Sequence, residues 1–237
     1  MGKIKPHLLE TIVFLVIILI LSLGSYSRNK LWSNPKDLWT DCLKKSPHKS
    51  RPYTNLGLAY SDLGEYDEAV HLLEKAVQLD QKDASAYFNY GIALQKKGEI
   101  NRAIGMLKKS LEIDPTFNMP FYTLGVIYFE KGEYKDSMEA FKKFVEAFPF
   151  FPEAHHSLGI AYAAQKQFDQ AVAEFESEIR INPYHTLAHI NAGQIYWYEF
   201  HNREKAIYHL RAALMLDPFL PNRSGIQRLV RLIEELS

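Results

Sequence analysis

The chain has 237 residues, of which 47% are hydrophobic and 24% are charged, a composition typical of folded proteins and unlike that of disordered ones. Lysine plus arginine and aspartate plus glutamate number 28 each, so the formal net charge is zero. This balance lacks the basic excess expected of a nucleic-acid-binding protein. The single cysteine, Cys42, excludes an intramolecular disulfide.

The first element in chain order is the apolar run LLETIVFLVIILILSLGSYSRNKLW, which covers residues 8–32. Thirteen Leu, Ile, Val and Phe residues lie within residues 8–24. At about −0.3 to −0.6 kcal/mol each, they outweigh the one glutamate near the edge of the run. The stretch is close to the lower length limit for a transmembrane helix. We therefore expect residues 1–27 to be a transmembrane anchor or a signal segment, with residues 8–24 in the membrane.

The residues that flank the run are compatible both with cleavage and with retention. Lys3 and Lys5 form a basic region before it, and Ser22-Leu23-Gly24 offers the small-x-small pattern that a signal peptidase accepts. Tyr26 and Trp32 are the aromatic types that hold a retained helix at the membrane interface. A secreted, untethered protein and a membrane-anchored one therefore both remain open at this point.

A short helix is expected next, within residues 28–49, in the stretch NPKDLWTDCLKKSP. Asn34 is a favoured N-cap residue, and Pro35 suits the first helical position. Cys42 and Pro47 have the spacing of the second helix of the repeats that follow. We interpret the stretch as a lone packing helix, with Cys42 as a small packing residue.

A period of 34 residues organises most of the remaining chain. The first two repeats read YTNLGLAYSDLGEYDEAVHLLEKAVQLD and YFNYGIALQKKGEINRAIGMLKKSLEID. Each repeat has two apolar stripes at helical spacing, which predicts two helices per repeat. Because glycine inside a helix costs roughly 1 kcal/mol relative to alanine, its recurrence at one phase indicates close approach of a neighbouring helix. These glycines are Gly57, Gly91, Gly125, Gly159 and Gly193.

Glycine and proline also mark where the predicted helices end. Gly64, Gly98 and Gly132 occupy the turn within a repeat, where the fourth repeat has Lys166 instead. Proline follows the second helix of most repeats, since it cannot continue a helix. The fifth repeat has one extra residue in YWYEFHNREKA, so we expect a distorted turn there.

This pattern resembles the tetratricopeptide repeat (TPR) family over roughly residues 50–220. In the fourth repeat the characteristic positions are Leu158, Gly159, Tyr162, Ala171, Phe175 and Pro183. The resemblance implies an all-α solenoid, a right-handed superhelix of helix-turn-helix units, which joins the predicted N-terminal transmembrane helix. The expected repeats are 50–83, 84–117, 118–151, 152–185 and 186–220. Residues 221–237 are expected to form a C-terminal capping helix, because terminal repeats need a polar-faced cap to stay soluble.

The TPR resemblance also implies where a partner binds. In the family, the first helix of each repeat lines the concave face, and peptides bind there. One polar side chain per repeat resembles the asparagine ladder that grips peptide backbones in the O-GlcNAc transferase family, and an amide can both donate and accept hydrogen bonds. The peptide-binding groove is therefore predicted to comprise Asn55, Phe88, Asn89, Tyr122, Val126, Phe129, His156, Ile160, Asn191, Gln194 and Trp197.

The pattern of titratable residues does not predict an active site. The nine histidines include no His-Glu-x-x-His, and there is no Cys-x-x-Cys or glycine-rich phosphate loop. We interpret His155 and His189 as packing residues, because they occupy the large-residue position of the repeat. The chain is therefore predicted not to be an enzyme, to have no metal site or cofactor, and to bind neither a small-molecule substrate nor nucleic acid.

The N-terminal part has a second, looser resemblance over residues 8–49. A final membrane span followed by a lone helix and TPR repeats is similar to transmembrane O-mannosyltransferase-type glycosyltransferases with TPR tails. The matching residues are Tyr26, Arg28, Asn29, Trp32, Trp39 and Pro47. The multi-span catalytic part of that family is absent here, so no transferase activity is implied. The resemblance favours a retained, single-pass anchor with the TPR part on the extracytoplasmic or periplasmic side.

Three functional readings follow from the sequence. The main one is a membrane-anchored, non-catalytic TPR scaffold that binds a peptide or a helix of a partner protein on its concave face. The groove should be dominated by Phe88, Tyr122, Phe129 and Trp197, because aromatic residues contribute most to interface energies. The alternatives are an accessory or split C-terminal TPR module of a membrane glycosyltransferase system and a secreted, untethered TPR adaptor.

Overall fold

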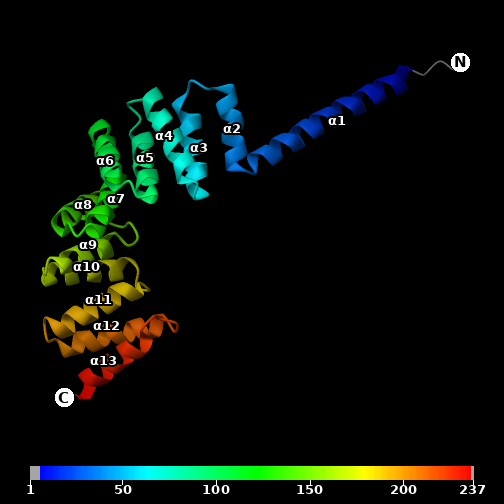
Figure 1. The fold of residues 1–237 in the computed structure, drawn as a ribbon. Helices are drawn as coiled ribbons and strands as arrows, with labels where there is room; N and C mark the ends of the chain where they lie inside the picture. The colour runs from blue at the N-terminus through cyan, green and yellow to red at the C-terminus, as the bar shows by residue number, and fades with distance from the viewer. Residues whose placement is uncertain (1–5, 236–237) are drawn as a thin grey trace. The chain divides into compact units, whose positions relative to one another are not determined.

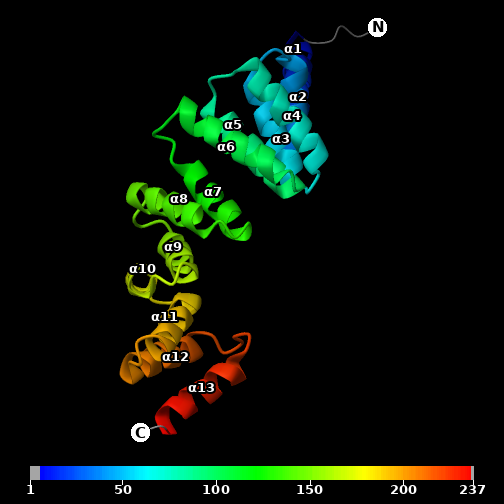
Figure 2. The same ribbon diagram turned by 60° about the vertical axis from the view of Figure 1, so that its left-hand side comes forward.

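The computed structural model describes residues 6–235, and all regular structure in this part of the chain is helical. The chain forms two compact units, Met1–Met106 and Leu107–Ser237. Within each unit, consecutive helices pack side by side in antiparallel pairs joined by short turns (Figure 1 and Figure 2). This arrangement agrees with the predicted all-α repeat architecture.

The first unit contains five complete helices and the beginning of a sixth. They are α1 (Pro6–Trp32), α2 (Pro35–Lys45), α3 (Ser50–Asp62), α4 (Tyr66–Leu79), α5 (Ala84–Lys97) and the start of α6 (Ile100–Ile113). The helix α3 packs against α2 and α4, and α4 also packs against α5. The helix α2 lies within residues 28–49, where the sequence predicts a lone helix, and α3 and α4 lie within the predicted first repeat, residues 50–83.

The helix α1 is continuous from Pro6 to Trp32, so the structure has no break at the predicted boundary at residue 27. It packs against α2 and projects away from the rest of its unit (Figure 1). Its side chains from Phe14 to Leu23 are exposed. The sequence predicts a transmembrane helix here, but no helix in the described part of the chain combines the length and the apolar character that crossing a membrane requires.

The local signals around α2 act as predicted. Asn34 has an extended backbone, and its side chain accepts a hydrogen bond from Lys36 N at 3.0 Å. Pro35 occupies the first helical position. Lys36 also attaches α2 to the first repeat, since its ammonium lies 3.1 Å from Glu65 Oε1 and 4.1 Å from the centre of the Tyr60 ring. Cys42 is half-buried and unbonded to another cysteine.

The second unit contains the end of α6 and seven further helices. They are α7 (Met119–Glu130), α8 (Tyr134–Ala147), α9 (Ala154–Ala164), α10 (Phe168–Ile181), α11 (Thr186–Tyr198), α12 (Arg203–Leu216) and α13 (Arg223–Glu235). From α7 to α13, each helix packs against the next one along the chain. The helix α13 turns Ile226, Val230 and Ile233 towards α12, which agrees with the predicted capping role.

The periodic glycines lie where two helices of one repeat touch. A Cβ atom at Gly125 would lie 2.7 Å from ring atoms of Phe141, and one at Gly159 would lie 2.6 Å from Phe175. Gly57 has the same relation to Leu73 in the first unit, at 2.7 Å. No real Cβ atom fits at such distances, so the pairs can close only around glycine. The prediction of close approach is confirmed at these positions.

The turn within each repeat needs a left-handed backbone. Gly64, Gly98 and Gly132 have φ angles of 78°, 89° and 77°. Lys166, which replaces glycine in the fourth repeat, adopts the same region with φ of 57°. The extra residue of the fifth repeat lengthens its turn to Glu199–Asn202, where His201 has φ of 49°. The sequence therefore located all of these turns, and the unusual one as well.

Candidate functional site

The predicted groove residues of the first unit lie on α3 and α5. Asn55 is half-buried, and its amide nitrogen donates to the Arg51 carbonyl of its own helix at 3.0 Å. Phe88 and Asn89 are also half-buried, on α5. The amide nitrogen of Asn55 is therefore already engaged within α3.

Three groove residues of α7 take part in packing within the second unit. The Tyr122 ring lies 5.6 Å from Phe141, 5.1 Å from Phe144 and 6.1 Å from Phe151. Val126 and Phe129 are half-buried against the same cluster, and Phe129 also contacts Tyr134 at 5.2 Å. The sequence predicts that these residues belong to the groove, and in the structure their side chains also pack around α7 and α8.

A hollow of about 190 Å³ opens between the first helices of the fourth and fifth repeats. It contains three predicted groove residues, Ile160 on α9 and Asn191 and Gln194 on α11, which the structure brings together. The remaining lining is apolar and comes from Ala163, Phe175 and Ile195. The hollow therefore combines an apolar lining with two amide side chains and no charged group.

The predicted groove residue His156 lies next to this hollow and contacts one of its amides. His156 Nε2 lies 3.1 Å from Asn191 Nδ2. The His156 ring is 8% exposed and packs against Phe175 and His185, with ring centroids 5.6 Å and 4.5 Å apart. Burial, and secondarily the neighbouring His185, lowers the pKa of His156 to about 4. The ring is therefore neutral at ordinary pH, and its Nε2 accepts the hydrogen bond from Asn191.

Trp197 lies one turn further along α11 and is half-buried against the core that α10, α11 and α12 share. It does not line the hollow. Gln194, by contrast, is exposed at the edge of the hollow. Of the predicted groove residues on α11, two therefore line the hollow, and Trp197 instead packs against the core.

A second buried histidine pair lies between α11 and α12. Nδ1 of His189 is 3.1 Å from Nδ1 of His209, and the His209 ring stacks on Tyr196 with an interplanar angle of 11°. Burial lowers the pKa of both histidines, that of His209 to about 4. Among the described residues, no three His, Cys, Asp or Glu side chains are grouped so that they could hold a metal ion. The predicted packing role of His189 agrees with these contacts.

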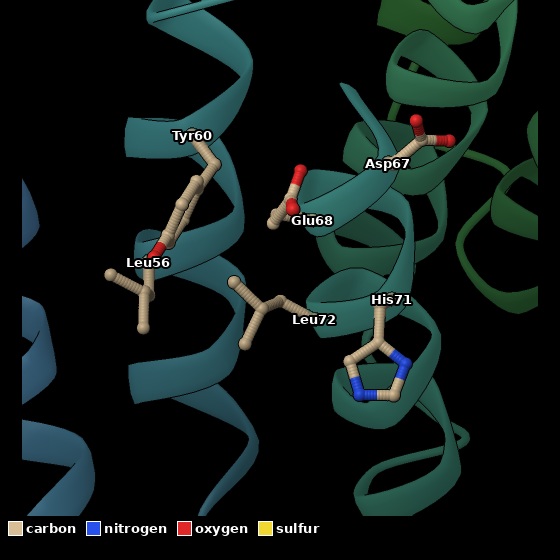
Figure 3. A pocket seen from close by; sticks show the side chains of 6 residues that line it. All are labelled: Leu56, Tyr60, Asp67, Glu68, His71 and Leu72. Atoms are coloured by element: carbon tan, nitrogen blue, oxygen red, sulfur yellow. The ribbon is translucent and has the colours of Figure 1, made fainter. Parts of the chain in front are cut away.

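A larger hollow, about 350 Å³, lies in the first unit between α3 and α4 (Figure 3). Leu72 and Glu68 project from α4 towards Tyr60 and Leu56 of α3. Asp67 and His71 complete its lining, and Asp67 is paired with Lys97 at 2.8 Å. None of these residues belongs to the predicted groove, and the two carboxylates give the hollow a more acidic character than that of the second unit.

Sequence reasoning missed part of the lining of the smaller hollow. Ile195 lies one turn beyond Asn191 on α11, and Phe175 reaches the hollow from α10. The missed signal was Gly159, because a residue without a side chain lets the Phe175 ring lie directly against α9, the helix that carries Ile160. The repeat phase alone could therefore have placed Phe175 at this site.

Family models match three stretches of the chain. A model described as TPR repeat matches residues 57–98, and two described as tetratricopeptide repeat match residues 84–117 and 122–186. None of the curated proteins matches the chain.

Solved structures of TPR proteins are similar to the chain. YrrB, described as a TPR protein with an unusual peptide-binding site, is 26% identical and covers 80% of this chain and 97% of its own, with a TM-score of 0.69. MamA of MSR-1 is 26% identical, covering 71% and 97% with a TM-score of 0.62. MamA of Desulfovibrio magneticus RS-1 is 22% identical, and the match covers 70% of this chain and 94% of MamA with a TM-score of 0.65, which shows a likeness of fold. Together with the repeat phase and the glycine contacts, these matches show that the chain belongs to the tetratricopeptide repeat family.

Proposed function

We propose that this chain is a non-catalytic scaffold that binds a peptide segment of a partner protein in the hollow between α9 and α11. The observation that carries the proposal is the lining of that hollow by Ile160, Asn191 and Gln194. An apolar concavity with a few fixed polar groups is the usual form of a binding site. YrrB, which is similar over most of its length, is described as having a peptide-binding site.

The aromatic residues of α7 are less suitable as the centre of binding than the sequence suggests. Tyr122 already contacts three phenylalanines, and its hydroxyl lies 3.5 Å from Ser157 Oγ. A partner that displaced these contacts would have to replace the packing energy that they supply. The proposed site is therefore the hollow of the fourth and fifth repeats, with Tyr122 and Phe129 as its structural support.

The test uses the full chain in detergent micelles and a phage-displayed library of random twelve-residue peptides. Ala163→Phe should fill the hollow and abolish binding of the selected peptides. Ala173→Phe is the matched control, because Ala173 is exposed on α10 and lies outside the lining. Thermal unfolding followed by circular dichroism checks that both variants fold.

Two outcomes would contradict the proposed site. A library that yields no binder to the native chain argues against peptide binding. Peptides that still bind Ala163→Phe but are lost on His71→Trp would place the site in the acidic hollow of the first unit, where His71 is part of the lining (Figure 3).

We also propose that α1 tethers the scaffold to a membrane. Its apolar side chains from Phe14 to Leu23 are exposed, and α1 packs against α2. An exposed apolar surface of this extent in water is unfavourable and marks a site of contact with a membrane or a protein. The looser resemblance of residues 8–49 favours the extracytoplasmic side for the repeats, and we include this assignment in the proposal.

Alkaline extraction of membranes tests the tether. The native chain should stay in the membrane pellet, and the double variant Leu19→Lys with Ile20→Lys should be released. N-terminal sequencing of the mature protein decides between anchor and signal, because a chain that starts at Ser25 has lost the apolar run. Release of the native chain by alkali would contradict the tether.

A further inference from the structure

The hydrogen bond between His156 and Asn191 determines which part of the Asn191 amide faces the hollow. The Asn191 nitrogen lies 3.1 Å from His156 Nε2, and Asn191 is half-buried in the lining. The oxygen and nitrogen of an amide point in directions about 120° apart in one plane. With its nitrogen directed at the ring, the oxygen of Asn191 is directed away from the ring and is available as an acceptor.

The surroundings of His156 keep its ring in the neutral, accepting form. His185, before α11, faces the ring, and Glu178 on α10 lies at the backbone N–H of His156. The Glu178 carboxylate is already engaged, since it accepts from the backbone N–H groups of Glu153 and His156. Burial disfavours an imidazolium at this position, and a neutral imidazole has one nitrogen that accepts and one that donates.

The size of the hollow indicates what kind of group can enter it. At about 190 Å³, it is comparable to engineered apolar cavities of about 150 Å³ that bind benzene. Ile160, Ala163, Phe175 and Ile195 form its apolar surface. One aromatic or branched aliphatic side chain therefore fits, and a charged one would lose hydration without gaining a partner.

The two amides on α11 indicate the backbone form of the occupant. Asn191 and Gln194 are three residues apart on one helix, so their Cβ atoms lie about 5–6 Å from each other. In an extended peptide, residues i and i+2 lie on one side at about 6.6–6.8 Å. An extended segment can thus offer one backbone group to each amide while one of its side chains enters the hollow.

We propose that His156 is a positioning residue that holds the Asn191 carbonyl oxygen as an acceptor, so that this hollow selects an extended segment with an apolar side chain and a backbone N–H that donates to Asn191. The proposal rests on the proposed function and specifies the partner for the same site. A helical partner is excluded, because the N–H groups in the interior of a helix are already bonded within it.

The test is a double-mutant cycle on the full chain in detergent micelles, with dye-labelled peptides from the phage library and fluorescence anisotropy as the readout. Each peptide is scanned by N-methylation, which removes one backbone donor at a time. One position should weaken binding to the native chain about five- to tenfold, the usual effect of one lost hydrogen bond. In His156→Phe the same methylation should have no further effect, and His156→Gln, which restores an acceptor, should recover the coupling.

A merely structural role of His156 predicts a different result. His156→Phe would then weaken all peptides equally, and every N-methylation would keep its native effect. That pattern, or binding that no single N-methylation weakens, overturns the proposal. Peptides whose selected sequences carry a charged residue at the position next to the sensitive N–H would overturn it as well.

A measurement without peptide separates this proposal from the proposed function. In ¹⁵N-labelled protein, a two-bond coupling between Asn191 Nδ2 and His156 Nε2 reports the N–H···N hydrogen bond directly. Its presence supports the positioning role, and its absence overturns that role whatever the library yields. If the coupling is present and the library yields no binder, the proposed function and the selection of a peptide are both contradicted, and only the hydrogen bond between His156 and Asn191 is supported.

Discussion

The carboxylate of Glu178, fully buried on α10, accepts a hydrogen bond from the backbone N–H of Glu153 at 3.1 Å. Its other oxygen accepts from His156 N at 3.4 Å. The N-terminus of α9 is therefore capped by the following helix and not by its own preceding residue, which has a left-handed backbone with φ of 65°. This contact also holds the start of the helix that carries His156.

Replacing Glu178 tests this cap. Glu178→Ala should lower the free energy of unfolding by about 1–3 kcal/mol, because two buried N–H groups lose their acceptor. Glu178→Gln keeps one acceptor oxygen and should lower the free energy of unfolding by less. Urea denaturation gives the values, and Glu146→Ala on α8, an exposed residue, is the control. An unchanged midpoint for Glu178→Ala would show that water satisfies these N–H groups equally well.

The buried histidines predict that acid destabilises the second unit. The pKa values of His156 and His209 are lowered to about 4 in the folded chain, against about 6.5 in an unfolded chain. The unfolded state then binds more protons than the folded state between these two pH values. The contribution of these histidines to stability is therefore fully present above pH 6.5 and is lost as the pH decreases towards 4. The contribution of His155 to stability has the opposite pH dependence, because Glu174 at 2.5 Å raises the pKa of His155.

Melting temperatures at several pH values between 4 and 8 check this prediction. The double variant His156→Gln with His209→Gln should show a flatter decline below pH 6.5 than the native chain. His71→Gln serves as control, because His71 is exposed. Equal slopes in the double variant and the native chain would mean that other groups control the acid response.

The glycines inside helices predict two opposite responses to the same substitution. Gly125→Ala should destabilise by about 1–3 kcal/mol, because its new methyl group would overlap with the Phe141 ring. Gly105→Ala, on the exposed side of α6 with nothing within 4 Å of the added atom, should stabilise by about 1 kcal/mol. Chemical denaturation of both variants measures the contrast, and equal effects would refute the close-contact explanation.

The left-handed backbone of Lys166 predicts a stabilising substitution. A residue with a Cβ atom costs about 1–2 kcal/mol in this region, whereas glycine does not. Lys166→Gly should therefore raise the free energy of unfolding by about 1 kcal/mol, and Gly132→Ala at the equivalent turn should lower it. Thermal and urea unfolding measure the stability of both variants. A loss of stability in Lys166→Gly would indicate an unrecognised role of the lysine side chain.

Much of the site could be predicted from the repeat phase, and part of it could not. Ile160, Asn191 and Gln194 line one hollow because the repeat phase puts them on the facing sides of successive first helices. Tyr122 and Phe129 were predicted to dominate the groove, but phase says nothing about what fills the space beside a ring. Here Phe151, from the loop after α8, folds back onto Tyr122.

The sequence by itself determined the helices, the Asn34 cap of α2, the turns and the family, since these depend on residue types at short, regular spacing. Only the tertiary structure decided that Asn191 donates to His156, that Asn55 bonds within its own helix and that Phe175 reaches the hollow. The physical reason is that a repeat period specifies which helix face a side chain occupies. Its hydrogen-bond partner and its exposure depend on the side chains of the neighbouring repeat.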